Sequence, residues 1–198
     1  MARKKELRVV VLSSTRGTDF GALLQEQRQG KLNNIKFVGL IANKKCLALL
    51  RAEASAIPNF FLNGKAPDFQ QTLLKKVQEL QPDLICLVGF LKILSPEFCT
   101  TFPNKILNVH PSLLPKYAGK MNLDVHAEVL QNKEKETGMT IHLVTPELDS
   151  GPIICQKKVA VKPTDTPESL KAKVQALEKK WYPEVLRWFR DGKIYFGN

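Results

Sequence analysis

Two short runs, Val9–Leu12 and Leu84–Val88, contain no polar residue and constrain the fold more than any other feature of the sequence. A strand with one face in water alternates apolar and polar residues, whereas a strand buried on both faces is apolar throughout. Segments with helical spacing follow both runs. This alternation predicts an α/β fold in which helices flank both faces of a mostly parallel sheet.

The other elements follow from the same patterns. Strands are expected at Leu7–Ser13, Phe37–Ile41, Phe60–Leu62, Leu84–Val88 and Ile106–Val109, and helices at Phe20–Gln29, Leu47–Ala54, Phe69–Leu80, from Ser95-Pro96-Glu97, and at Asp124–Gln131. Gly138–Val144 and Ile153–Val161 alternate like strands and are joined by a turn-rich link, which predicts an antiparallel hairpin added to the parallel part. The whole chain, 1–198, is expected to form one Rossmann-like domain.

The last helix has a clear start. Thr166 is expected to cap it, with Pro167 in the first helical position. Leu170, Val174, Leu177 and Trp181 recur at helical spacing and predict its buried stripe. Pro183 is expected to kink or restart this helix because it lacks a backbone donor.

Charge and cysteine content narrow the function classes. The net charge is +11, but much of the excess lies scattered on predicted helix faces, so nucleic acid is an unlikely partner and a phosphorylated ligand fits better. The four cysteines show no metal-binding spacing, which favours a reduced cytoplasmic protein without a metal. No apolar run is long enough to cross a membrane, and the short apolar run after the basic start does not predict a secretory signal. A monomer or homodimer is expected.

Asn108 and His110 stand where an apolar strand meets a proline. Residues two apart in a strand face the same side, so the amide and the imidazole can converge on one spot. An amide donor and a group that can be cationic near neutral pH suit a developing oxyanion. The simpler interpretation is that both side chains complete the hydrogen bonds of a strand end.

The position of this pair favours the functional interpretation. Ligands of parallel sheets bind at the carboxyl ends of the strands, where the Thr15–Asp19 and Gly89–Leu94 loops also fall. The Thr15–Asp19 loop leads into a helix with Thr18 or Asp19 as its expected cap, which makes an anion site. Its single glycine does not match a dinucleotide-binding fingerprint.

Four other polar residues allow two interpretations. His126 is expected to be a surface or half-buried residue, and His142 a structural member of its strand. Asp149 precedes Ser150-Gly151 and reads first as a turn residue. Glu178 flanks the stripe of the last helix and could reach a ligand, although a helix carboxylate is usually solvated.

Taken together, these segments resemble the folate-dependent formyltransferases, and among them the glycinamide ribonucleotide formyltransferases. The likeness runs from Val9 to about Gly192 and is densest at Val88–Ser95, Asn108–Tyr117, Val144–Pro152, and Glu178 with Tyr182-Pro183. The motif Asn-x-His-Pro-Ser-Leu-Leu-Pro marks users of 10-formyltetrahydrofolate broadly, so it specifies the formyl chemistry better than the acceptor. The short chain favours a single-domain member over methionyl-tRNA formyltransferase or formyltetrahydrofolate deformylase, which would need a further domain.

The resemblance implies a reaction and roles. The amine of glycinamide ribonucleotide attacks the formyl carbon of 10-formyltetrahydrofolate, a step of purine biosynthesis. Asn108 and protonated His110 would stabilise the tetrahedral oxyanion, while Asp149 favours the charged imidazole and helps carry the lost proton through a water. The implied folate-binding residues are Leu91, Lys92, Ile93, Leu94, Asn108, Thr145, Pro146, Glu147, Leu148 and Asp149. The implied ribonucleotide-binding residues are Gly17, Thr18 and Asp19 at the phosphate, with Gln175 and Glu178 beside them and Glu178 at the ribose.

Three departures from the family pattern stand out. Thr15-Arg16-Gly17-Thr18-Asp19 replaces Gly-x-Gly-Ser-Asn, and a carboxylate at Asp19 would repel a phosphate unless Arg16 or the helix end compensates. The loop after Tyr117 is longer than in relatives, with Asp124 in place of a histidine. Ala66 stands where some relatives have a folate-binding arginine, with Lys65 nearby.

These departures leave other functions open. One is formyl transfer to another amine, such as an amino sugar, and another is hydrolysis of the formylfolate. A different class is a basic nucleic-acid-binding protein on the same fold, with salt-sensitive affinity and no folate binding. The presence of Asn108, His110 and Asp149 together argues against a site that has lost its function.

Overall fold

The apolar runs form the inner strands of one seven-stranded sheet, in the order β3-β2-β1-β4-β5-β6-β7. The structure is a computed structural model that describes residues 6–120 and 122–194. The strands are β1 (Leu7–Ser13), β2 (Ile35–Ala42), β3 (Asn59–Phe61), β4 (Leu84–Val88), β5 (Ile106–His110), β6 (Glu136–Leu143) and β7 (Ile153–Ala160). Every residue of β4 is buried, as its unbroken apolar run predicts.

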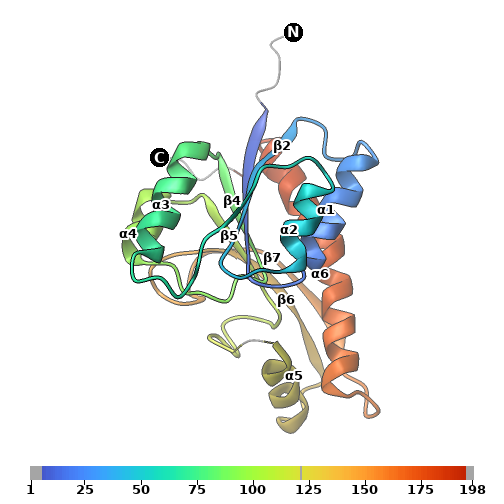
Figure 1. Ribbon diagram of the computed structural model, residues 1–198. Helices are drawn as coiled ribbons and strands as arrows, with labels where there is room; N and C mark the ends of the chain where they lie inside the picture. The colour runs from blue at the N-terminus through green and yellow to red at the C-terminus, as the bar shows by residue number, and fades with distance from the viewer. Residues whose placement is uncertain (1–5, 121, 195–198) are drawn as a thin grey trace.

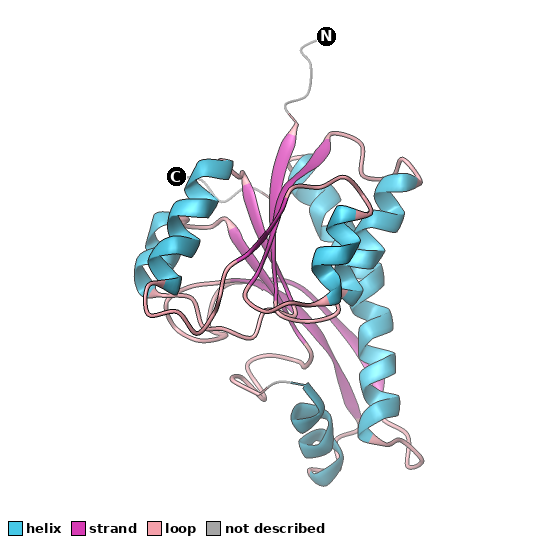
Figure 2. Cartoon of the chain, viewed as in Figure 1, coloured by secondary structure: helices cyan, strands magenta, loops and turns pink. Residues whose placement is uncertain are grey.

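The helices cover both faces of the sheet (Figure 1). They are α1 (Thr18–Arg28), α2 (Leu47–Glu53), α3 (Phe69–Leu80), α4 (Pro96–Thr101), α5 (Asn122–Gln131) and α6 (Pro167–Arg190). Helices α1, α2 and α6 share one hydrophobic cluster with the sheet, and α3 and α4 share the other. Figure 2 shows these two groups on opposite sides of the strands, with α5 apart at one end.

The mixed sheet confirms the predicted fold class. Strands β3, β2, β1, β4 and β5 pair in parallel, and β6 and β7 form the predicted antiparallel hairpin. Strand β6 also pairs antiparallel with β5, which places His142 opposite Asn108. From β1 the chain continues to β2 and β3 on one side of the sheet, and from β4 it continues to β5 on the other side. The loops after β1 and β4 therefore lead in opposite directions and leave room for a ligand between them.

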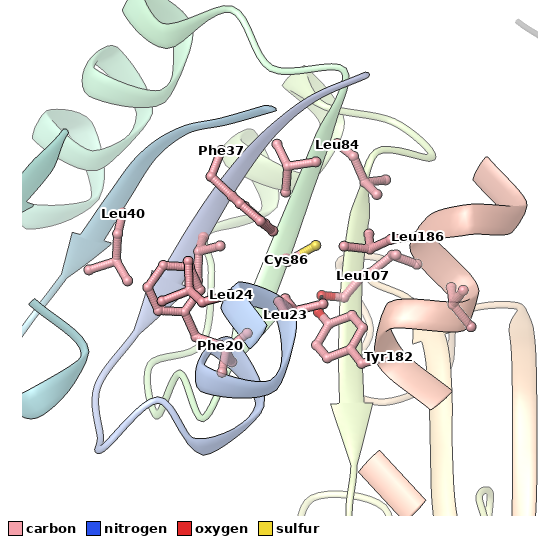
Figure 3. Close-up of a cluster of buried hydrophobic side chains, with 14 of the residues drawn as sticks. Phe20, Leu23, Leu24, Phe37, Leu40, Leu84, Cys86, Leu107, Tyr182 and Leu186 are labelled. Carbon is pink, nitrogen blue, oxygen red and sulfur yellow. Dashed lines mark hydrogen bonds between the residues drawn. The ribbon is translucent and has the colours of Figure 1, made fainter. Parts of the chain in front are cut away.

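Tyr182 of α6 belongs to the larger core cluster, part of which Figure 3 shows. Its side chain is fully buried, and its hydroxyl lies 3.2 Å from the carbonyl oxygen of Leu87 and 3.3 Å from that of Leu107. The helix is therefore joined to the ends of β4 and β5 by a buried polar contact as well as by apolar packing.

Two sequence-based expectations about helices need correction. Gly17, with a φ of 62°, occupies the N-cap of α1, and neither Thr18 nor Asp19 caps it, because the helix already begins at Thr18. Helix α6 is one uninterrupted element across Pro183, so the proline does not restart it. The predicted caps Ser95 and Thr166 are confirmed, each accepting a hydrogen bond from the third residue of its helix. Over residues 6–120 and 122–194, no helix has the length and apolar character to cross a membrane.

Candidate active site

A cavity of about 670 Å³ opens at the carboxyl edge of the sheet, between the loops that follow β1, β4 and β5. That volume suits a small-molecule ligand or cofactor. All the residues expected to bind or react, except Gly17, line this cavity: Thr18, Asp19, Leu91, Lys92, Ile93, Leu94, Asn108, His110, Thr145, Pro146, Glu147, Leu148, Asp149, Gln175 and Glu178. The fold therefore brings together segments from both halves of the chain.

His110 is held in one orientation by the turn that follows β5. The imidazole is buried, and its Nδ1 lies 3.0 Å from the hydroxyl of Ser112. That hydroxyl donates its single proton to the carbonyl oxygen of Lys116, so it must accept from Nδ1. The Nδ1–H is therefore committed to the protein, and Nε2 is the ring nitrogen that this turn leaves without a partner.

Asp149 faces that same nitrogen. One carboxylate oxygen, Oδ2, lies 3.3 Å from Nε2 of His110 and accepts a hydrogen bond of 2.8 Å from the Gly119 amide. Burial raises the pKa of Asp149, but the contacts with His110 and Gly119 outweigh burial and lower it below its usual value. Asp149 is thus a carboxylate at neutral pH, and its φ of 51° confirms that it is also a turn residue.

Asn108 is positioned by His142, which the sequence pattern predicts to be only a structural residue of its strand. Nδ1 of His142 lies 2.8 Å from the carbonyl oxygen of Leu143, so Nδ1 carries a proton and donates it. The other nitrogen, Nε2, then accepts from Nδ2 of Asn108 at 3.1 Å. Burial lowers the pKa of His142, which keeps this ring neutral and able to accept. The second amide hydrogen of Asn108 remains available to a ligand.

The loop after β4 is fixed from both sides. The Leu91 amide donates to Oγ of Ser14 at 2.8 Å. Gln70 of α3 donates to the carbonyl oxygen of Ile93 and accepts from the Ser95 amide. Such a fixed backbone can present its free N–H and C=O groups to a flat polar ring. Ile93 and Leu148 are 67% and 53% exposed, and both line the same cavity.

The other end of the cavity is bounded by α1 and α6. Asp19 and Glu178 are 7% and 6% exposed, so Glu178 does not flank the buried stripe of α6 as expected but is part of it. Burial raises the pKa of Asp19 to about 6, against the opposing charge of Lys179. Burial and the charge of Asp19 raise the pKa of Glu178 to about 8, opposed by Lys171 and Lys179.

The altered loop after β1 fits the fold through its two neighbouring glycines. Gly17 does not line the cavity, and a Cβ there would lie 2.9 Å from Cβ of Ala48, so this position has no room for a side chain. At Gly89, whose φ is +56°, a Cβ would lie 2.4 Å from Oγ1 of Thr15. Thr15 is accommodated because its neighbour lacks a side chain.

Sequence reasoning missed three residues that line the cavity, namely His126, His142 and Lys171. His126 is fully buried rather than half-buried, its Nδ1 has no hydrogen-bond partner within the described residues, and burial lowers its pKa to about 4. No local signal distinguishes these side chains from ordinary helix and strand residues. Within the described ranges, no group of His, Cys, Asp and Glu side chains is arranged to hold a metal ion.

Comparisons with known proteins agree with this geometry. The model of the formyl transferase family matches residues 7–186. The phosphoribosylglycinamide formyltransferase of Escherichia coli (strain K12) is 35% identical over 192 residues, covering 95% of this chain and 89% of that protein. The structure of the phosphoribosylglycinamide formyltransferase from Coxiella burnetii in complex with CHES matches with a TM-score of 0.90 at 39% identity, covering 98% of this chain and 92% of that one.

A second kind of relative shares the fold. The structure of a formyltetrahydrofolate deformylase from Pseudomonas syringae pv. tomato matches with a TM-score of 0.87 at 25% identity. The match covers 100% of this chain but 65% of the deformylase. The longer relative therefore contains a substantial part that has no counterpart here.

Proposed function

The chain belongs to the formyl transferase family, and from that premise we propose that its cavity transfers the formyl group of 10-formyltetrahydrofolate to the amine of glycinamide ribonucleotide. Its family makes it a transferase of one-carbon groups, and the named relatives act in purine biosynthesis. The observation that carries the proposal is the meeting of Asn108, His110 and Asp149 at one wall of a cavity with the size of a ligand site.

The reaction begins when the acceptor amine attacks the formyl carbon, and the carbonyl oxygen becomes an oxyanion. The free amide hydrogen of Asn108 and the Nε2–H of protonated His110 stabilise that oxygen. Preorganised donors aimed at developing charge lower the barrier because they need no reorganisation during the reaction. His142 and Ser112 supply that preorganisation. His142 accepts one amide hydrogen of Asn108 and leaves the other for the substrate, and Ser112 accepts from Nδ1 of His110 and leaves Nε2.

Asp149 has two tasks in this scheme. Its carboxylate lies 3.3 Å from Nε2 of His110, so the two groups form an ion pair when the ring is protonated. Its lowered pKa keeps it able to take up the proton that the amine loses, directly or through a water. The proton then passes to the leaving nitrogen of the folate, which completes the transfer.

The two ends of the cavity hold the two substrates. The pterin of the folate lies against Leu91, Lys92, Ile93 and Leu94 and against the 145–149 loop, where backbone groups are held in place by Ser14 and Gln70. The ribonucleotide lies at the other end, with its phosphate at Gly17, Thr18 and Asp19 and its ribose near Gln175 and Glu178. This arrangement places the formyl group beside Asn108 and His110.

We expect His110→Ala and Asp149→Asn each to lower kcat for formyl transfer by about 100-fold, which corresponds to about 3 kcal/mol of transition-state stabilisation. The measurement is steady-state turnover with 10-formyltetrahydrofolate and glycinamide ribonucleotide. Asp68→Asn, an exposed carboxylate at the start of α3, is the matched control and should retain full turnover. Near-normal turnover of either site variant would show that its assigned role is wrong.

The acceptor is tested in the same assay. Glycinamide ribonucleotide, an amino sugar phosphate and water are compared as acceptors at equal donor concentration. Faster transfer to the ribonucleotide supports the proposal, whereas loss of formyl groups at the same rate without any amine would identify a hydrolase.

We further propose a cytoplasmic enzyme, monomeric or homodimeric, with small-molecule partners. Four unpaired cysteines support a reducing compartment.

A further inference from the structure

Two carboxyl groups lie in the wall of the cavity at the acceptor end, and neither has an obvious counter-ion. Asp19 in the first turn of α1 and Glu178 in the middle of α6 are 7% and 6% exposed. Both line the same cavity. Within the described part of the chain, neither carboxyl forms an ion pair, and Oδ1 of Asp19 is fully buried without any hydrogen-bond partner.

Two buried carboxyl groups in the wall of one cavity cannot both be ionised at low cost. Each charge loses its hydration on burial, and each then repels the other in a medium of low dielectric. A buried oxygen such as Oδ1 of Asp19 also needs a donor, because an unsatisfied buried acceptor costs free energy. A proton retained by one of the two carboxyls removes one of the two charges.

We propose that Asp19 and Glu178 hold one proton between them at neutral pH, and that Asp19 is a positioning residue that keeps Glu178 in a neutral, hydrogen-bond-donating form suited to a phosphorylated acceptor. The inference rests on the proposed function for the identity of that acceptor. It also explains how Asp19 is tolerated beside a phosphate, where relatives have an amide. The pair contributes one negative charge instead of two.

Among the titratable groups around the cavity wall, Glu178 is the one expected to lose a proton just above pH 7. The charged and titratable side chains around the pair are Lys171, Lys179 and Tyr182 on α6, Arg16 before α1, and His126 on α5. Tyr182 stays neutral because burial raises its pKa well above the usual value, and His126 stays neutral because burial lowers its pKa to about 4. The pKa of Glu178, about 8, therefore lies in a window where these two neighbours do not titrate.

If Glu178 loses its proton, the affinity of the cavity for anionic ligands decreases as the pH rises. Loss of the shared proton adds a second negative charge next to the phosphate and removes a donor. If only the protonated pair binds the phosphate, affinity falls about tenfold between about pH 7 and about pH 9, with the midpoint set by Glu178. A phosphate monoester is already fully ionised in this range, since its second pKa is about 6.

A direct test follows the side-chain carboxyl carbons by carbon-13 NMR in the intact, ligand-free protein. The Glu178 resonance is assigned by its absence in Glu178→Gln. In the wild type it should titrate well above pH 7, and in Asp19→Asn the midpoint should move down by about one pH unit or more. The proposal is overturned if Glu178 titrates in the ordinary carboxyl range, or if Asp19→Asn leaves its midpoint unchanged.

Ligand binding is tested separately by calorimetry with ribose 5-phosphate, which requires no formyl transfer. The wild type and Glu53→Gln, an exposed carboxylate of α2 used as the matched control, should lose affinity about tenfold between about pH 7 and about pH 9. Glu178→Gln, which keeps an uncharged amide donor at every pH, should show little change over that range. In Asp19→Asn the loss of affinity should begin about one pH unit lower than in the wild type. An equal loss in the wild type and in Glu178→Gln would overturn the proposal.

The two measurements separate the inference from the function on which it rests. If ribose 5-phosphate does not bind at any pH, the acceptor assignment fails, while the NMR titration still decides whether the pair shares a proton. If the two carboxyls titrate independently at ordinary values, the shared proton is wrong, while the acceptor assay still decides the function.

Discussion

Two histidines with opposite protonation tasks define the reactive wall of the cavity. His110 donates from Nδ1 to Ser112 and turns Nε2 toward Asp149, with which it forms an ion pair when the ring is protonated. His142 donates from Nδ1 to the Leu143 carbonyl and uses Nε2 as an acceptor for Asn108, which requires the neutral ring. The sequence shows both as single histidines in strands. Their roles differ because their hydrogen-bond partners and their burial differ.

We expect His142→Ala to lower kcat about tenfold, because Asn108 loses the hydrogen bond that orients its amide and such a bond contributes about 1 kcal/mol. KM for either substrate should change little, since His142 acts through Asn108 rather than on the ligand. Single-turnover rates with both substrates bound provide the measurement.

His142→Gln is the matched comparison for that prediction. Its side-chain oxygen can accept from the Asn108 amide, so this variant should recover part of the lost rate. Unchanged turnover in His142→Ala, or equal defects in both variants, would contradict an orienting role.

At the scale of elements, α6 shows how a pattern can predict a helix and misplace its buried face. The expected stripe runs through Leu170, Val174, Leu177 and Trp181, but between Val174 and Pro183 the buried residues are Glu178 and Tyr182. Leu177 and Trp181 are only partly buried. Leucine and tryptophan are the more apolar choices, so periodicity alone favours them. Tyr182 is selected instead because its hydroxyl reaches the buried carbonyl groups of β4 and β5.

The start of α6 follows local rules more closely. Thr166 accepts from the Ser169 amide at 3.2 Å, and Oγ of Ser169 accepts from the Thr166 amide at 3.0 Å. We expect Thr166→Ala to lower the free energy of unfolding by about 1 kcal/mol, the usual cost of losing a helix cap. Urea denaturation followed by circular dichroism measures this difference.

Thr164→Ala serves as the control for the cap. Thr164 is exposed in the preceding turn, and within the described residues its hydroxyl makes no hydrogen bond. This variant should match the wild type within error. Equal destabilisation by both substitutions would mean that the turn, and not the cap, determines the stability.

At the scale of the whole molecule, the two hydrophobic clusters determine which side chains reagents can reach. Cys86, Cys99 and Cys155 are buried, and Cys46 is half-buried at the N-cap of α2. Burial raises the pKa of Cys86 to about 12 and also raises the pKa of Cys99 and Cys155. Thiolate is the reactive form, so these three thiols should be inert in the native fold.

We therefore expect a thiol reagent such as dithionitrobenzoate to modify Cys46 first in the native protein and all four cysteines in denaturant. The absorbance change on labelling counts the reactive thiols. Cys46→Ser should remove the fast phase and leave the slow one. A second thiol reacting as fast as Cys46 would show that one of the clusters opens readily.

Much of the architecture could be predicted because it depends on neighbours in the sequence. The apolar runs at Val9–Leu12 and Leu84–Val88 are buried strands, and Ser95 and Thr166 cap helices, since periodicity and capping act over a few residues. The cap of α1 was predicted wrongly because Gly17 takes a left-handed conformation there, and its close packing against Ala48 is a contact with another helix.

The chemistry of the site required the assembled fold. Asn108 and His110 could be placed on one side of a strand from their spacing alone, because successive residues in a strand alternate in direction. Three further relations depend on how distant segments meet: Nε2 of His110 against Asp149, Asn108 against His142, and Asp19 beside Glu178. Each joins residues from different elements, so strand register, loop closure and helix packing decide it. Only that packing sets the burial and the neighbouring charges that determine which of these groups carries a proton.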